Sequence, residues 1–118
     1  ATLLVIDDDP SIARVLEVAM TLHAGWSARF VRDEAGARAS LAREVPHYIL
    51  LDLCLADADG LEVLCALQAD HDLSRTRVVL TTAGGPTLSA ATLRAHGISH
   101  ALGKPFDPLA LPALLERP

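Results

Sequence analysis

Carboxylates follow two separate apolar runs in this sequence. Asp7, Asp8 and Asp9 come directly after one run, and Asp52 comes directly after another. Like charges that are held together oppose one another's ionisation, so the triplet is either a solvated turn or part of a cation site. Oxygen atoms are the ligands that Mg²⁺ prefers, and Mg²⁺ takes only one or two protein carboxylates while keeping several waters. The chemistry that these residues could support is therefore magnesium binding, with room left for a phosphate.

Hydroxyl and ammonium groups end two later apolar runs. Thr81 and Thr82 close the run at residues 77–82, and Lys104 lies in the stretch "GKPF". If the fold brought Lys104 to the carboxylates, one ammonium would face three acidic groups. About two negative charges would stay uncompensated, and such a cluster favours a hard divalent cation.

Short apolar runs alternate with helical patterns along the chain. The runs predict strands at residues 2–6, 28–31, 48–53, 77–82 and 100–104. Most of them are continuous rather than alternating, which is typical of parallel strands covered on both faces. The patterns between them predict helices at residues 10–22, 34–44, 60–70, 86–97 and 107–117. Five repeats of strand and helix indicate an α/β fold with a doubly wound, five-stranded parallel sheet and helices on both faces.

Three of the predicted helices carry further signals. In the first, Ile12, Val15, Leu16, Ala19 and Leu22 recur at three- and four-residue intervals and predict its buried face. Gly97 predicts the end of the fourth helix as a C-cap. Pro112 lacks the amide that a continuous helix would need, so we expect a kink or a late start in the last helix. That helix also contains leucines that could face the core or a partner, namely Leu109, Leu111, Leu114 and Leu115.

The predicted sheet brings the polar side chains together, because ligands of such sheets bind beyond the carboxyl ends of the strands. The residues expected at that edge are Asp7, Asp8, Asp52, Thr81, Thr82 and Lys104. Neighbouring strand residues point to opposite faces, so either threonine could supply the hydroxyl. Asp57 and Asp59 are expected to shape the turn into the third helix, with backbone freedom from Gly60.

Bulk composition narrows the class of protein. The 118 residues are 51% hydrophobic and 21% charged with a formal net charge of -5, which fits one compact domain without a nucleic-acid surface. No apolar run approaches the roughly 20 residues of a membrane span, so we expect a cytoplasmic domain. Cys54 and Cys65 are expected to be reduced thiols. Because Ala1 stands almost inside the first apolar run, we expect residues 1–118 to be a domain excised from a longer protein.

Four motifs in order give the chain its resemblance to a known family. They are "DDD" after the first strand, "LDLCLADADG" around Asp52, "TTAGG" after the fourth strand and "GKPF" after the fifth. Over essentially all of its length the chain resembles the receiver domains of bacterial two-component response regulators. The resemblance implies a flavodoxin-like strand order, 2-1-3-4-5.

The resemblance also implies a role for each residue of the predicted site. Asp52 would accept a phosphoryl group from a phosphohistidine of a partner histidine kinase or phosphotransfer protein. The cofactor would be Mg²⁺, bound directly by Asp8, Asp52 and the backbone carbonyl of Cys54, with Asp7 holding it through water. Thr82, chosen over Thr81 because Ala83 follows it as in the family, and Lys104 would contact the phosphoryl oxygens. Such a domain is not an enzyme acting on other substrates, since it catalyses only its own phosphorylation and dephosphorylation.

Several positions depart from the family pattern. Ala101 stands where many receivers carry an aromatic residue whose rotamer reports phosphorylation. Gly84 and Gly85 add freedom after the fourth strand, and Pro112 disturbs a helix that many receivers use to dimerise. Phosphorylation is chemically supported, whereas these departures argue against the usual relay to a homodimer interface. The resemblance implies an effector domain beyond residue 118 as a further partner.

Two other functions stay open on the sequence alone. One is a receiver-like interaction module that signals without phosphorylation. The other is a phosphatase of the haloacid-dehalogenase type, in which Asp7 would be the nucleophile and Asp9 the acid/base. The phosphatase needs further carboxylates on a strand after the lysine and leaves Asp52 unexplained, and motif matches without their context are weak.

Overall fold

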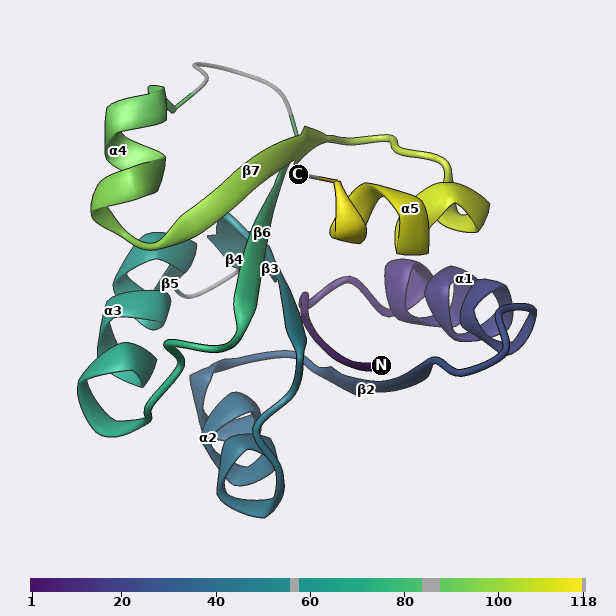
Figure 1. Cartoon of the computed structure of the whole chain (residues 1–118), viewed down its shortest axis with the longest axis horizontal. Helices are drawn as coiled ribbons and strands as arrows, with labels where there is room; N and C mark the ends of the chain where they lie inside the picture. Colours follow the sequence, from purple (N-terminus) through teal and green to yellow (C-terminus); the bar gives the residue numbers. More distant parts are fainter. Residues whose placement is uncertain (56–57, 84–87, 118) are drawn as a thin grey trace.

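A single parallel sheet forms the centre of the computed structural model, which describes residues 1–55, 58–83 and 88–117 (Figure 1). Its strands are β1 (Thr2–Ile6), β2 (Ser27–Val31), β3 (Tyr48–Asp52), β6 (Arg77–Thr82) and β7 (Ile98–Gly103). They lie in the order β2-β1-β3-β6-β7, and every neighbouring pair is parallel. Numbered within this sheet alone, the order is 2-1-3-4-5, as predicted.

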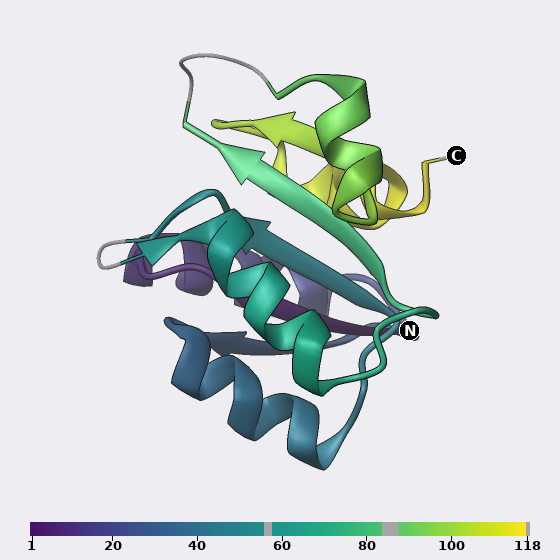
Figure 2. The same ribbon diagram turned by 90° about the vertical axis from the view of Figure 1, so that its left-hand side faces the viewer.

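Helices cover both faces of the sheet. They are α1 (Pro10–Thr21), α2 (Glu34–Arg43), α3 (Gly60–Asp70), α4 (Ala90–Ala95) and α5 (Leu111–Glu116), the last preceded by the 3-10 turn η1 (Pro108–Ala110). Figure 2 shows α2, α3 and α4 on the near face, with α1 and α5 behind the sheet. None of the helices in the described ranges is long and apolar enough to cross a membrane.

Alternate residues of each strand enter two separate cores. Leu3 and Val5 of β1 pack with the α1 and α5 side chains, whereas Leu4 and Ile6 pack with those of α2 and α3. Successive strand side chains point to opposite faces, so a strand that is apolar throughout must be covered twice. This explains why the apolar runs of the sequence are continuous.

The predicted elements are confirmed, although α4 (Ala90–Ala95) is clearly shorter than the helix predicted at residues 86–97. The strand β7 begins at Ile98, two residues before the predicted start. The last helix has the late start expected from Pro112, which lies in the first turn of α5 after η1. Gly97 follows the end of α4 with a φ of 71°, the left-handed conformation that a C-cap glycine adopts. The predicted glycine freedom at residues 84–85 lies outside the described residues.

The buried face of α1 is narrower than predicted. Leu16 and Ala19 are buried as expected, together with Met20, but Val15 and Leu22 are exposed. Apolar side chains therefore cover more of the circumference of α1 than the sheet can bury. The helical period revealed that α1 is amphipathic, but which part of the apolar side meets the sheet depends on how the neighbouring elements pack.

A short hairpin that the sequence did not reveal follows β3. Its strands β4 (Cys54–Leu55) and β5 (Ala58–Asp59) pair antiparallel. Asp59 then caps α3 by accepting a hydrogen bond from the Leu61 amide at 2.8 Å, which confirms its predicted role in the turn. Asp57, to which the same role was assigned, lies outside the described residues.

Candidate functional site

Three carboxylates meet where the central strands end. Asp7 and Asp8 follow β1, Asp52 ends β3, and β1 and β3 are parallel neighbours. One carboxylate oxygen from each residue lies within 4.8 Å of the other two. The juxtaposition predicted from the strand ends is therefore present, and three oxygen ligands at this spacing suit a hard cation.

Lys104 reaches the carboxylates from the loop after β7. Its Nζ donates hydrogen bonds to Asp7 Oδ2 at 3.0 Å and to Asp52 Oδ2 at 3.2 Å. Its backbone amide donates to the Thr82 carbonyl at 2.7 Å, which fixes the start of the loop against the end of β6. A single ammonium group thus bridges two buried carboxylates.

Burial sets the electrostatics of this cluster. Asp7 and Asp52 are only 8% and 6% exposed. Burial raises the pKa of Asp52 and the charge of Asp7 adds to the effect, although the Cys54 amide and Lys104 act against it. Burial also lowers the pKa of Lys104, but its hydrogen bond to Asp7 and the charges of both carboxylates outweigh this, so that the pKa lies above its usual value. The site holds more negative charge than its lysine neutralises.

Replacing Asp52 with asparagine is expected to stabilise the metal-free chain at neutral pH by about 1 kcal/mol, because a poorly compensated buried charge disappears. Since the folded-state pKa of Asp52 lies above its ordinary value of 3.8, ionisation costs folding stability as the pH rises through the folded-state pKa. Chemical unfolding with chelator present measures the free energy of unfolding of Asp52→Asn and of the parent chain. The two should be equally stable below pH 3.8, and the advantage of Asp52→Asn should grow between that pH and neutrality.

Asp72→Asn provides a control of opposite sign. The hydrogen bonds from Ser74 lower the pKa of this exposed carboxylate, so its ionised form favours the folded state above the ordinary pKa. The Asp72→Asn chain should gain no stability as the pH rises. A gain from Asp52→Asn that did not depend on pH would contradict the electrostatic explanation.

Asp9 lies next to the cluster but has a different task. Its carboxylate accepts hydrogen bonds from the Ser11 amide at 2.9 Å and the Ser11 hydroxyl at 2.6 Å, which caps α1 and lowers the pKa of Asp9. Its own amide donates to Asp7 Oδ1 at 2.9 Å and helps to orient that carboxylate. The third acid of the triplet therefore caps α1 and directs its carboxylate to Ser11.

Thr82 and Cys54 lie at the ends of the elements that carry the cluster. Thr81 pairs with Asp52 in the sheet and is buried, whereas Thr82 is partly exposed and is the more accessible hydroxyl. Cys54 is an exposed free thiol whose backbone amide donates to Asp52 Oδ1 at 3.1 Å. Cys65 is also a free thiol, as predicted.

One charged residue near the site was missed by sequence reasoning. The exposed Arg32 follows β2 and lines a hollow of about 240 Å³ together with Asp7 and Asp8. The parallel pairing of β1 with β2 brings the end of β2 to the acidic edge. The available signal in the sequence was the position of Arg32 directly after the apolar run at residues 28–31, which places its side chain at the carboxyl end of a strand.

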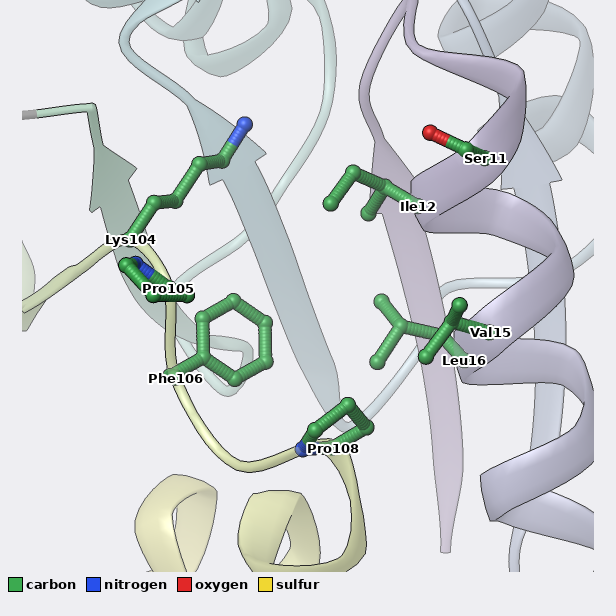
Figure 3. A pocket seen from close by; sticks show the side chains of 8 residues that line it. All are labelled: Ser11, Ile12, Val15, Leu16, Lys104, Pro105, Phe106 and Pro108. Atoms are coloured by element: carbon green, nitrogen blue, oxygen red, sulfur yellow. The ribbon is translucent and has the colours of Figure 1, made fainter.

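A second, larger hollow lies between α1 and the loop that carries Lys104 (Figure 3). Its volume is about 560 Å³, and apolar side chains such as Ile12, Leu16 and Phe106 line most of it. The aliphatic stem of Lys104 borders this hollow. The acidic cluster therefore adjoins an apolar surface that the sequence did not reveal.

Comparison with known proteins places these features in a family. The family model described as "Response regulator receiver domain" matches residues 3–116. The nitrogen assimilation regulatory protein NtrX of Azorhizobium caulinodans is 32% identical over 117 residues, which is 98% of this chain and 25% of that protein. The DNA-binding response regulator MtrA of Mycolicibacterium smegmatis is 32% identical over 111 residues, which is 94% of this chain and 47% of that protein. The chain thus spans half or less of these two relatives.

The fold is also similar to that of solved structures. The chemotaxis response regulator CheY4 of Vibrio cholerae superposes with a TM-score of 0.84 at 24% identity, covering 99% of this chain and 97% of that one. At this identity the likeness concerns the fold alone. It agrees with the strand order and with the helices on both faces of the sheet.

Proposed function

The chain belongs to the response regulator receiver domain family, and we propose that it is a phosphorylation-dependent signalling switch with Asp52 as phospho-acceptor. The observation that carries the proposal is the position of Asp52. It is a buried carboxylate at the end of the central strand, with one oxygen held by Lys104 and the other by the Cys54 amide. A carboxylate in such a frame has a fixed direction of attack, as a nucleophile in phosphoryl transfer requires.

The proposed reaction is the transfer of a phosphoryl group from a phosphohistidine of a partner kinase or phosphotransfer protein. An Asp52 carboxylate oxygen forms a bond to phosphorus while the phosphorus–nitrogen bond breaks, and the bonding electron pair leaves with the imidazole nitrogen. The products are an aspartyl phosphate and a free histidine. Little covalent work is left for other residues beyond positioning and charge neutralisation.

The residues present fit a magnesium ion. Three carboxylate oxygens of Asp7, Asp8 and Asp52 lie within 4.8 Å of one another, and the cluster has one lysine for these acids. In the proposal Asp8, Asp52 and the Cys54 carbonyl would hold Mg²⁺, and Asp7 would hold it through water. When bound, Mg²⁺ would neutralise charge that develops on the phosphoryl oxygens.

Lys104 and Thr82 would contact the phosphoryl group once it is attached. The Lys104 ammonium already donates to an Asp52 oxygen, so a small movement would bring it to a phosphoryl oxygen. Thr82 is partly exposed at the last position of β6, where its hydroxyl could turn inward. A phosphate adds almost two negative charges, which is enough to shift the loops that these two residues carry.

The partners of this switch are part of the proposal. They are a histidine kinase or phosphotransfer protein that supplies the phosphoryl group, and an effector domain outside these 118 residues, all acting in the cytoplasm. Ala101 is exposed on β7 and offers no aromatic side chain as a reporter. The signal would therefore leave the site through the Lys104 segment that follows β7 rather than through an aromatic rotamer.

Intact-protein mass spectrometry tests the proposal. The chain is incubated with Mg²⁺ and a small phosphoryl donor, alongside the Asp52→Asn variant and a sample with chelator. One added phosphoryl group is expected in the parent chain with Mg²⁺ and in neither control. An adduct that persists in Asp52→Asn and is lost in Asp7→Asn would favour the phosphatase chemistry. No adduct in a chain that binds Mg²⁺ and ignores a beryllofluoride mimic would favour an interaction module that signals without phosphorylation.

A further inference from the structure

Arg32 lies at the acidic edge without a task in the proposed function. It directly follows β2, and Lys104 directly follows β7, so these are the two cations that directly follow strands of the central sheet. Strands β2 and β7 are the two outer strands, and the carboxylates come from the ends of β1 and β3 between them. The acidic cluster therefore has one cation on each side.

The backbone holds Arg32 directly beside Asp7. Ile6 of β1 pairs with Val31 of β2, and the Asp7 amide donates to the Val31 carbonyl at 3.0 Å. This hydrogen bond continues the pairing one residue past the strand ends, where neighbouring strands lie about 4.8 Å apart. An arginine side chain is longer than this spacing, so its head group can reach the space in front of Asp7.

The side chains of Arg32 and Asp7 share one face of the sheet. Phe30 packs with the side chains of α1 and α5, whereas Val31 packs with those of α2 and α3. Because successive strand side chains alternate, Arg32 returns to the α1 side. The hollow of about 240 Å³ agrees with this placement, since Arg32 lines it together with Asp7, Asp8 and residues of α1. The guanidinium thus borders the same open space as two of the carboxylates.

The fold itself does not engage the Arg32 guanidinium. Arg32 is exposed, and it forms no hydrogen bond or ion pair with any residue in the described ranges. Its neighbour Asp33 caps α2 instead, by accepting a hydrogen bond from the Gly36 amide at 2.8 Å. Lys104 differs, because two carboxylates already hold its ammonium group. The N–H donors of Arg32 are therefore available to a ligand.

The charge of the cluster explains why a free cation is useful at this edge. Three carboxylates face one lysine, so a bound divalent cation would bring the cluster close to neutrality. A phosphoryl group arrives with almost two negative charges, and a neutral cluster beside further acids such as Asp9 and Asp33 attracts it little. Arg32 supplies the missing positive charge, and guanidinium groups bind phosphate oxygens through paired hydrogen bonds.

We propose that Arg32 recruits the phosphoryl donor and favours donors of high negative charge. This inference rests on the proposed function, because it gives Arg32 a part in the same reaction. The guanidinium holds an oxygen of the incoming phosphoryl group from the β2 side, and the group then bonds to Asp52 and meets Lys104 on the β7 side. Arg32 takes no proton and forms no covalent bond, so its contribution is to the binding of the donor.

The rate of phosphoryl uptake by the 118-residue chain with Mg²⁺, followed by intact-protein mass spectrometry, tests this role. Of two small donors, acetyl phosphate carries about two negative charges at neutral pH, and phosphoramidate, whose nitrogen is protonated, carries about one. Arg32→Gln should slow uptake from acetyl phosphate about fivefold and uptake from phosphoramidate clearly less. Arg32→Lys keeps the charge and should retain most of the rate. Arg43→Gln removes an exposed arginine at the far end of α2 and is the matched control, with no change expected.

Two further measurements separate an effect of charge from a disturbed site. Added salt should slow uptake from acetyl phosphate more in the parent than in Arg32→Gln, because screening removes an attraction that the variant lacks. The Mg²⁺ affinity, measured from stabilisation against chemical unfolding, should rise about twofold in Arg32→Gln, since one cation no longer repels the metal. A disturbed site would instead lose Mg²⁺ affinity and donor rate together.

Several results would overturn the recruiting role. They are an unchanged rate in Arg32→Gln, an equal loss with both donors, a rate in Arg32→Lys as low as in Arg32→Gln, and a Mg²⁺ affinity that fails to rise. Each leaves the proposed function intact as long as the parent chain takes up a phosphoryl group on Asp52. A parent chain that takes up none would overturn the proposed function and the role of Arg32 with it.

Discussion

Replacing Lys104 with methionine is expected to lower the free energy of unfolding of the metal-free chain by about 3 kcal/mol, the cost of leaving buried carboxylates without their cation. Lys104 is the only lysine in the sequence. Its side chain bridges Asp7 and Asp52, whose own side chains are only 5% and 7% exposed. Methionine keeps the length and the apolar stem but removes the charge, so packing beside the hollow of Figure 3 is largely retained.

Magnesium should reverse most of this loss. Without Lys104 a divalent cation has no competitor for the oxygens of Asp7 and Asp52, so its affinity should rise and its stabilising effect should grow. The measurement is chemical unfolding of Lys104→Met and the parent, each with chelator and with saturating Mg²⁺. Arg94→Gln, which removes an exposed cation on α4, is the control and should change little. An equal loss of stability with and without Mg²⁺ would contradict the electrostatic role of Lys104.

Gly60→Ala is expected to destabilise the chain by a similar amount, about 3 kcal/mol, because the added methyl group has no space. A Cβ at this position would lie 2.3 Å from the Asp52 carbonyl oxygen and 2.8 Å from the Leu53 Cα. Both are backbone atoms, which cannot rotate away as a side chain can. The Gly60 amide also donates to the Leu53 carbonyl at 2.7 Å, so the start of α3 is held against the end of β3.

The strain from Gly60→Ala should also reach the site. Moving the backbone at Asp52 displaces its carboxylate, so both Mg²⁺ affinity and phosphoryl uptake should fall along with stability. Gly103→Ala is the matched control, since a Cβ there meets no atom within 4 Å. Thermal unfolding and the mass assay on both variants separate the outcomes. A Gly60→Ala chain as stable as Gly103→Ala would show that the close approach does not constrain the fold.

Gly60 also shows where sequence reasoning fell short. The sequence suggested that this glycine supplies backbone freedom in a turn, yet Gly60 has no positive φ. A glycine is needed at position 60 because the backbone at Asp52 and Leu53 approaches it too closely for a Cβ atom. Such an approach is decided by how α3 packs on β3, and residue type alone does not distinguish it from a flexible turn.

The sheet and most of the site were predictable because they follow from strong local patterns. Continuous apolar runs indicated parallel strands, and the rule that ligands bind beyond their carboxyl ends placed Asp7, Asp52 and Lys104 at one edge. The ammonium bridge between the two carboxylates fits the same rule. Each of these inferences needs only the order of strands along the chain.

The features that were not predictable depend on packing between distant elements. The short β4–β5 hairpin has two-residue strands, too short for any period to reveal. The exposure of Val15 and Leu22 reflects the rotation of α1 on the sheet, which the helical period leaves open. Arg32 reaches the acidic edge only because β2 pairs with β1. In each case the local sequence fits several packings, and the tertiary structure selects one.

The most direct test of the central claim is to locate the phosphoryl group. After reaction with Mg²⁺ and a small donor, borohydride reduces an aspartyl phosphate to homoserine, and peptide mass spectrometry then identifies the converted residue. Conversion at position 52 alone, absent without donor, is the predicted result. Conversion at Asp7, Asp8 or Asp9 instead, or a stable phosphate on a histidine, would contradict the assignment of Asp52 as the phospho-acceptor.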